Sequence, residues 1–176
     1  YAPRYAVVAE RAGVRFGSTA PTFEVVQRLP LGPGFDNVDF GALGGPAEAD
    51  AAPLTAAQAK RLASIVEASW AVLDDVVAKA PAQLRKGPRG GGRDRDGVFA
   101  HVVAAEASYA RKLGVRHKVP EPDDVEAIVA LRKDILEALR SARAADATPW
   151  LPRYFARRVA WHVLDHAWEI EDKSEQ

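Results

Sequence analysis

The sequence predicts an all-α fold, in which a four-helix bundle follows a short N-terminal extension of one helix and one strand. In four long segments, apolar residues recur at spacings of three and four, the period of a helix with one buried face. These segments begin and end at residues that typically cap or break helices. Helices of about 17 to 25 residues are also the lengths expected in a bundle rather than in a sheet fold.

The chain has 176 residues, which is about one domain, and we divide it into three parts. Residues 1–30 form the N-terminal extension, residues 31–53 form a linker rich in glycine and proline, and residues 54–176 form the bundle. The chain starts at Tyr1 and contains no methionine, so we expect the extension to be the truncated end of a module that continues upstream.

The extension is predicted to contain a short helix over residues 2–12, ended by Gly13, and a strand from Phe23 to Leu29, ended by Pro30. A single strand leaves both of its edges unpaired. We therefore expect it to pair with upstream sequence, to pair with a second molecule, or to lie as an extended arm.

The first helix of the bundle is predicted over about residues 55–79. Thr55, followed three residues later by Gln58, forms a capping box, and Pro81 ends the pattern. The inward stripe consists of Leu62, Ile65, Val66, Ser69, Val72, Leu73, Val76 and Val77.

The second helix is predicted to begin at a cap formed by Asp94 or Asp96 and to stop at Gly114. Its inward stripe contains a histidine, His101, among apolar residues. The stripe consists of Val98, His101, Val102, Ala105, Tyr109 and Leu113.

The third and fourth helices also have clear start signals. The third begins at Pro122 and the two aspartates that follow it, and continues to about Ala144. The fourth begins with Pro152 in its first turn and runs to about Asp172. The third helix is predicted to bury Val125, Ile128, Val129, Leu131, Ile135, Leu136 and Leu139.

Composition excludes several classes of function. Lysine plus arginine and aspartate plus glutamate both number 24, so no global positive field favours nucleic-acid binding. Cysteine is absent, which excludes disulfides, a cysteine nucleophile and thiolate ligands to a metal. No apolar run is long enough to suggest a membrane span, and no signal peptide is evident. We expect a cytoplasmic protein that acts on a small-molecule substrate.

Three of the four histidines are candidate metal ligands. His162 and His166 are four residues apart, so a helix presents both on one face, and His101 lies on the inward stripe of the second helix. The alternative for each is a core histidine that donates a hydrogen bond to a carbonyl group. His117 follows Gly114 without a periodic pattern, and we interpret it as a solvated loop residue.

Three carboxylates are expected near these histidines. Glu169 lies two turns after His162, so it is a candidate metal ligand, an acceptor for an imidazole N–H group, or a catalytic proton carrier. The alternative is a carboxylate that is simply paired near the helix end. Asp165 is rotated away from the histidine stripe, and Glu106 lies on the same helix as His101.

A basic, glycine-rich segment precedes the second helix and is a candidate substrate-binding loop for an anionic group. Its cations are Arg85, Lys86, Arg89 and Arg93. The alternative is a solvated connector. In the last helix, Trp161 and Trp168 form a second apolar stripe, so we expect it to be buried on two sides, within the bundle or against a second copy in a homodimer.

The segments from His101 to Glu106 and from His162 to His166, on the second and fourth helices, resemble the DinB-like (DinB/YfiT) superfamily of four-helix-bundle metalloenzymes. The resemblance covers about residues 54–173. It implies that one histidine of the second helix and the H-x3-H pair of the last helix bind a divalent metal. Members of this family include transferases and isomerases that use a low-molecular-weight thiol, mycothiol or bacillithiol.

Our hypothesis is therefore a site of three histidines for zinc, nickel, iron or manganese, which lowers the pKa of a bound thiol or water molecule. The content of alanine, arginine and glycine is typical of a high-GC source, for which mycothiol is the expected thiol. Two alternatives stay open: a metal-dependent hydrolase with Glu169 as the general base, and a bundle without catalytic activity that binds a partner.

Overall fold

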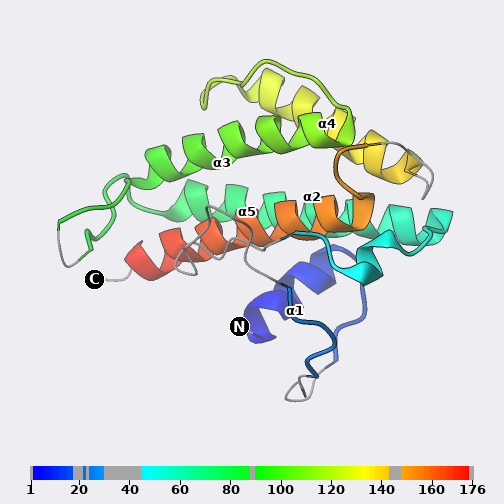
Figure 1. The fold of residues 1–176 in the computed structure, drawn as a ribbon. Helices are drawn as coiled ribbons and strands as arrows, with labels where there is room; N and C mark the ends of the chain where they lie inside the picture. The colour runs from blue at the N-terminus through cyan, green and yellow to red at the C-terminus, as the bar shows by residue number, and fades with distance from the viewer. Residues whose placement is uncertain are drawn as a thin grey trace.

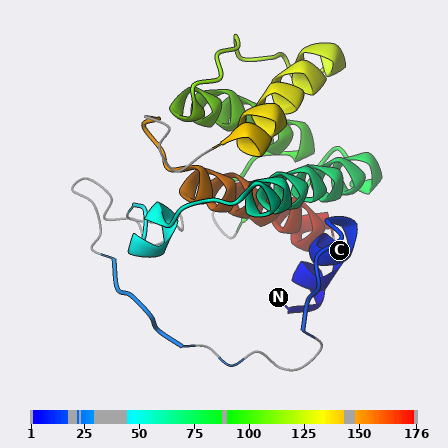
Figure 2. The same cartoon turned by 90° about the vertical axis from the view of Figure 1, so that its right-hand side faces the viewer.

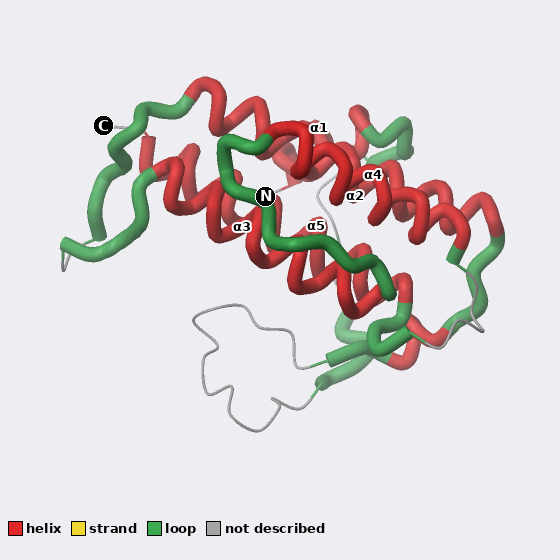
Figure 3. The backbone as a smooth tube through the Cα atoms, turned by 90° about the horizontal axis from the view of Figure 1, so that it is seen from above, coloured by secondary structure: helices red, strands yellow, loops and turns green. Residues whose placement is uncertain are grey.

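The structure is a computed structural model that describes residues 2–17, 22, 24–29, 45–87, 90–142 and 148–174. Among these residues it contains five α-helices and two short 3-10 helices. Figure 3 shows helices and loops but no strand in the described ranges. The prediction of an all-α fold is therefore confirmed. None of the helices in the described ranges has the length and apolar character that crossing a membrane requires.

The helices lie in three layers. Figures 1 and 2 show α2 and α5 side by side in the middle, with α3 and α4 on one side of them and α1 on the other. The most extensive contact is between α2 and α5; α4 packs mainly on α2, and α3 mainly on α5. The helices are α1 (Ala2–Arg11), α2 (Ala56–Lys79), α3 (Arg95–Ala110), α4 (Val125–Ser141) and α5 (Pro152–Ser174).

Local sequence signals explain most of the helix ends. The Thr55 hydroxyl accepts from the Gln58 backbone N–H at 3.2 Å, and the Gln58 side chain accepts from the Thr55 N–H at 3.0 Å, so the predicted capping box forms. Asp124 caps α4 by accepting from the Ala127 N–H at 3.0 Å. A 3-10 turn, Arg111–Leu113, extends α3, and Gly114 then ends it with a left-handed φ of 88°.

The start of α3 differs from the prediction. Asp94 occupies the N-cap position, but its side chain does not accept from the first turn of the helix. It accepts instead from Lys86 Nζ at 2.6 Å and from the Leu84 N–H at 3.5 Å. Asp94 binds Lys86 instead of capping the helix because a hydrogen bond between an ammonium and a carboxylate group is stronger than one from a backbone amide.

The predicted strand from Phe23 to Leu29 is wrong over residues 24–29, which have no regular secondary structure. Phe23 and Pro30 lie outside the described residues. Val25 and Val26 are 69% and 86% exposed. The physical reason is that no described segment offers a second strand to satisfy the backbone groups of this one.

The predicted linker is partly structured. Residues 31–44 lie outside the described residues, but Glu48–Ala51 forms a 3-10 helix, η2, that contacts α5. Asp50 is buried there, and its carboxylate accepts from Arg157 at 2.5 Å. The end of this segment is therefore part of the packed structure.

The core lies between the layers, and α5 is buried on both sides. Trp168 packs edge-on against Tyr5 of α1, with 5.0 Å between ring centroids, so α1 covers part of the second apolar stripe of α5. Two residues predicted to face inward on α4, Val125 and Val129, are instead 67% and 59% exposed. They lie at the edge of the stripe, whereas Leu131, Ile135 and Leu139 of the same helix are fully buried.

Candidate metal centre

The contact between α3 and α5 brings three histidines together. His101 comes from α3, and His162 and His166 come from successive turns of α5. Their ring centroids are 5.2 Å apart for His101 and His162, 4.9 Å for His101 and His166, and 4.7 Å for His162 and His166. One ring nitrogen from each lies within 4.8 Å of the other two, so the group can hold a metal ion. Because zinc–nitrogen bonds are about 2.0–2.1 Å long, small side-chain rotations have to bring the rings closer when an ion binds.

Two of these imidazoles have no hydrogen-bond partner among the described residues. His162 is only 8% exposed and His101 is half-buried, yet neither ring donates or accepts a hydrogen bond there. A core histidine with a structural role is expected to satisfy its ring nitrogens with a carbonyl or carboxylate group. The ring nitrogens of His101 and His162 are not among the described side-chain atoms that are buried without a partner, so water can reach them and their lone pairs are available to a ligand.

The electrostatic surroundings keep these imidazoles neutral. Burial, reinforced by the neighbouring His166, His101 and Arg158, lowers the pKa of His162 to about 3. Burial also lowers the pKa of His101, with further contributions from His166 and Arg93, against the opposing effect of Glu169. Neutral imidazole is the form that binds a metal.

Glu169 orients His166. Its carboxylate lies 2.7 Å from His166 Nδ1 and 2.5 Å from Lys173 Nζ. The hydrogen bond from His166, followed by that from Lys173, lowers the pKa of Glu169 to about 2, so the carboxylate is ionised and can only accept. The proton of a neutral His166 is then on Nδ1, which leaves Nε2 free as a ligand atom. A carboxylate with so low a pKa is a weak proton acceptor at neutral pH.

The other two carboxylates lie outside the histidine cluster. Asp165 is exposed on α5. Glu106 is fully buried, but it pairs with Arg132 of α4 at 3.2 Å, and Arg132 also binds Asp74 of α2 at 2.9 Å. Five residues separate Glu106 from His101, which is a rotation of about 140° on a helix. The two side chains therefore point to different helix interfaces.

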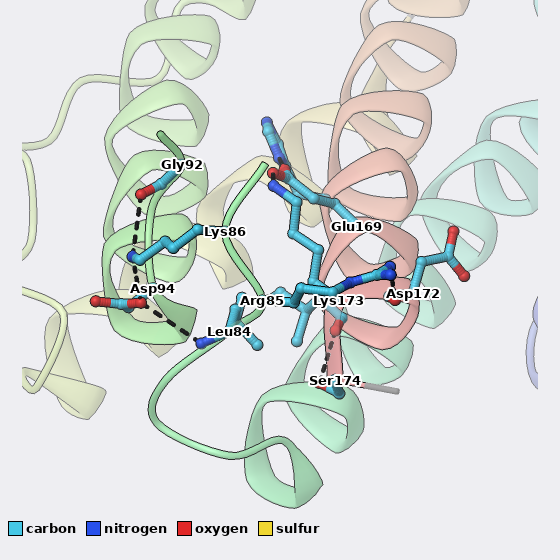
Figure 4. A network of polar contacts seen from close by, with 11 residues as sticks. Leu84, Arg85, Lys86, Gly92, Asp94, Glu169, Asp172, Lys173 and Ser174 are labelled. Atoms are coloured by element: carbon cyan, nitrogen blue, oxygen red, sulfur yellow. Dashed lines mark hydrogen bonds and ion pairs between the residues drawn. The ribbon is translucent and has the colours of Figure 1, made fainter. Parts of the chain in front are cut away.

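The basic loop before α3 is packed against the end of α5, as Figure 4 shows. The Arg85 N–H donates to the Lys173 carbonyl at 3.0 Å, and its guanidinium donates to the Asp172 carbonyl at 3.1 Å. Lys86 is paired with Asp94. Arg93 is exposed, and its charge acts on His101.

Among the predicted substrate-binding residues, Arg85 and Lys86 are thus engaged in contacts within the chain, and Arg89 lies outside the described residues. His117 is in the loop between α3 and α4, where it pairs with Asp134 at 2.8 Å, and it is not a member of the cluster.

Sequence reasoning missed two cations beside the cluster, Arg158 and Lys173. Arg158 is one turn before His162, and its charge contributes to the low pKa of that histidine. Lys173 is one turn after Glu169 and binds it. The four-residue spacing to an already identified residue is the signal that could have found both, because such residues are neighbours on a helix.

Three imidazoles from two helices form a ligand set that suits zinc, nickel or iron, and three protein ligands leave a position open for another molecule. The half-buried position of His101 and His166 at the helix interface is compatible with access to such a position. Comparison of the chain with protein-family models, with curated proteins and with solved structures finds no match.

Proposed function

We propose that this protein is a divalent-metal-dependent enzyme of the DinB-like superfamily, in which α2 to α5 form the four-helix bundle. The order of the ligands supports the proposal. His101 lies on the second of these four helices, and His162 and His166 lie on the last, as the resemblance of the sequence to this superfamily implies.

The observation that carries the proposal is the absence of partners for His101 and His162 among the described residues. The ring nitrogens are not among the side-chain atoms that are buried without a partner in the described ranges, so without an ion they are hydrated. A bound ion would replace that water, because it accepts the lone pairs of both rings. Zinc, nickel, iron and manganese are the candidate ions, and the purely nitrogen donor set favours the first three over manganese, which prefers oxygen ligands.

The reaction we propose is a transfer or isomerisation that uses a low-molecular-weight thiol of the mycothiol type and a small-molecule substrate. The bound ion supplies a Lewis acid at its open positions. The protein's own groups prepare this centre: burial keeps His162 neutral, Glu169 holds the proton on His166 Nδ1, and Lys173 fixes Glu169. Arg93 adds positive charge on the side of His101, which favours an anionic substrate.

Elemental analysis of protein purified without an affinity tag tests the proposal. We expect close to one equivalent of zinc, nickel, iron or manganese per chain, lost in His162→Ala. The matched control is His117→Ala, which removes a histidine that pairs with Asp134 outside the cluster. A wild-type protein without stoichiometric metal after incubation with each ion, or equal metal in both variants, would overturn it.

The thiol is tested on the cobalt-substituted protein. Addition of mycothiol is expected to produce a thiolate-to-cobalt absorption band, and its disulfide form, which has no free thiol, is the control. If the thiol leaves the cobalt spectrum unchanged while the protein retains its metal, the thiol part of the proposal is wrong and the metal centre stands.

A metal-dependent hydrolase is less favoured, because it requires a general base. Glu169 is the candidate from the sequence, and its pKa of about 2 and its two cationic or N–H partners make it a weak base. A hydrolase of this kind would lose turnover in Glu169→Gln while keeping its metal.

A further inference from the structure

Arg158 occupies an unusual position next to the histidine cluster. It lies on α5 one turn before His162, and its guanidinium is 4.7 Å from the ring centroid of Trp161 and 5.7 Å from that of Tyr109. Its Nη2 donates to the Tyr109 hydroxyl at 3.3 Å. The Tyr109 ring in turn contacts the His162 ring edge-on, with 5.6 Å between centroids. Arg158 is therefore connected to the histidine cluster through Tyr109, which contacts both Arg158 and His162.

The charge of Arg158 is not balanced within the described part of the chain. It forms no ion pair with any carboxylate described there, and its Nη1 is buried without a hydrogen-bond partner. Removing a charged donor from water without pairing it is unfavourable, and arginines that are buried are normally paired. An anion from outside the described part of the chain would complete this group.

Arg132 shows what a completed group looks like in the same protein. Its guanidinium also lies over an indole ring, that of Trp70, at 5.2 Å. It differs in having two carboxylate partners, Glu106 and Asp74. Two other arginines of α5 are also engaged: Arg157 pairs with Asp50, and Arg153 donates through Nε and Nη2 to two carbonyl oxygens and to Gln58.

We propose that Arg158 and the Tyr109 hydroxyl bind the carboxylate group of a substrate held at the three-histidine centre. The anion site itself is independent of the proposed function, whereas the placement of the rest of the substrate at the metal centre rests on it. A guanidinium N–H and a phenol O–H are both donors, and together they match the two oxygens of one carboxylate. A single cation between two aromatic faces balances one negative charge, which favours a carboxylate over a doubly charged phosphate.

Acetate binding to the cobalt-loaded protein, followed by the cobalt absorption spectrum, tests the proposal. Arg158→Gln is expected to raise the acetate Kd at least tenfold and to change the cobalt Kd less than twofold, since a hydrogen bond to a charged group is worth about 1.5–3 kcal/mol. Tyr109→Phe should raise the acetate Kd less. The matched control is Arg157→Gln, the adjacent residue, which should leave acetate binding unchanged.

A second measurement does not depend on a metal. In the metal-free protein, acetate is expected to shift the Nε–H signal of Arg158 in a nitrogen-15 correlation spectrum, the signal being assigned by its loss in Arg158→Lys. If cobalt binds and Arg158→Gln leaves the acetate Kd unchanged, the anion site is wrong while the proposed function stands. If cobalt does not bind but acetate shifts this signal, the proposed function fails and the anion site stands.

If cobalt does not bind and acetate does not shift the Arg158 signal, the proposed function and the anion site are both overturned. Phosphate that binds more tightly than acetate through Arg158 would contradict the assignment to a carboxylate.

Discussion

Within the described part of the chain, the Glu106 cluster and the histidine cluster lie between helices and are built in opposite ways. In the first, Glu106 of α3, Arg132 of α4 and Asp74 of α2 pair with one another, so that the buried cation and the buried anion each have a partner. In the second, His101 and His162 face each other between α3 and α5 without a hydrogen bond to any described residue. The same helix, α3, contributes to both.

The presence or absence of internal partners distinguishes a cluster with a structural role from a candidate binding site. A paired cluster fixes how three helices pack, and its buried charges, those of Glu106 and Arg132, are already balanced. A cluster with unused lone pairs can bind a ligand without losing a contact within the protein. Arg132 and Arg158 repeat this contrast for two arginines that both lie over indole rings.

Breaking the paired cluster should have the largest effect. Arg132→Met leaves Glu106, which is 1% exposed, without its cation and should lower the free energy of unfolding by about 3–5 kcal/mol. Urea denaturation followed by circular dichroism measures it. Adding Glu106→Gln should restore part of the loss. Arg140→Met, which breaks an exposed pair with Glu67, is the control and should cost less than about 1 kcal/mol.

A loss below about 1 kcal/mol in Arg132→Met would mean that the paired cluster is not a structural group.

Acid should destabilise the metal-free protein through the histidine cluster. The pKa of His162 is about 3 when folded and 6.5 when unfolded, so the unfolded chain takes up the proton first. Stability is fully present above pH 6.5 and falls as the pH decreases toward 3, by about 2 kcal/mol between pH 8 and pH 5. Unfolding in a chelator at several pH values measures it.

The variant His162→Leu is the control for this pH dependence, because it removes the titrating group. An equal slope in that variant would contradict the assignment to His162.

Weakening the orientation of His166 should have a smaller effect. Glu169→Gln retains an oxygen that accepts from His166 Nδ1 but loses the negative charge, so we expect about tenfold weaker metal binding, or about 1.4 kcal/mol. Competition with a chromophoric chelator measures the metal Kd. Asp165→Asn, an exposed carboxylate on the same helix, should leave it unchanged. Equal Kd values in the two variants would show that Glu169 does not position the ligand.

The smallest effect should have the opposite sign. His162→Leu replaces a polar imidazole that is 8% exposed by an apolar side chain of similar size, and it should raise the free energy of unfolding of the metal-free protein by about 1 kcal/mol, because burying an apolar group is more favourable. Urea denaturation in a chelator measures it. His117→Leu, which loses the hydrogen bond to Asp134, should not be stabilised. A clear destabilisation by His162→Leu would mean that the imidazole has a structural role.

Local signals predicted the helices well because they depend on neighbouring residues. The capping box of Thr55 and Gln58, the left-handed Gly114 and Pro152 in the first turn of α5 each lie where the sequence placed a helix end. The strand prediction over residues 24–29 failed because a strand depends on a partner strand, which the described part of the chain does not provide.

By itself, the sequence determined the all-α fold and the face that carries His162 and His166, since both follow from helical periodicity. Only the tertiary structure decided which polar residues pair between different helices. Glu106, five residues from His101, forms an ion pair with Arg132, whereas Arg158 has no carboxylate partner among the described residues. Pairing depends on how helices distant in sequence pack against one another, and the period of a single helix carries no information about that packing.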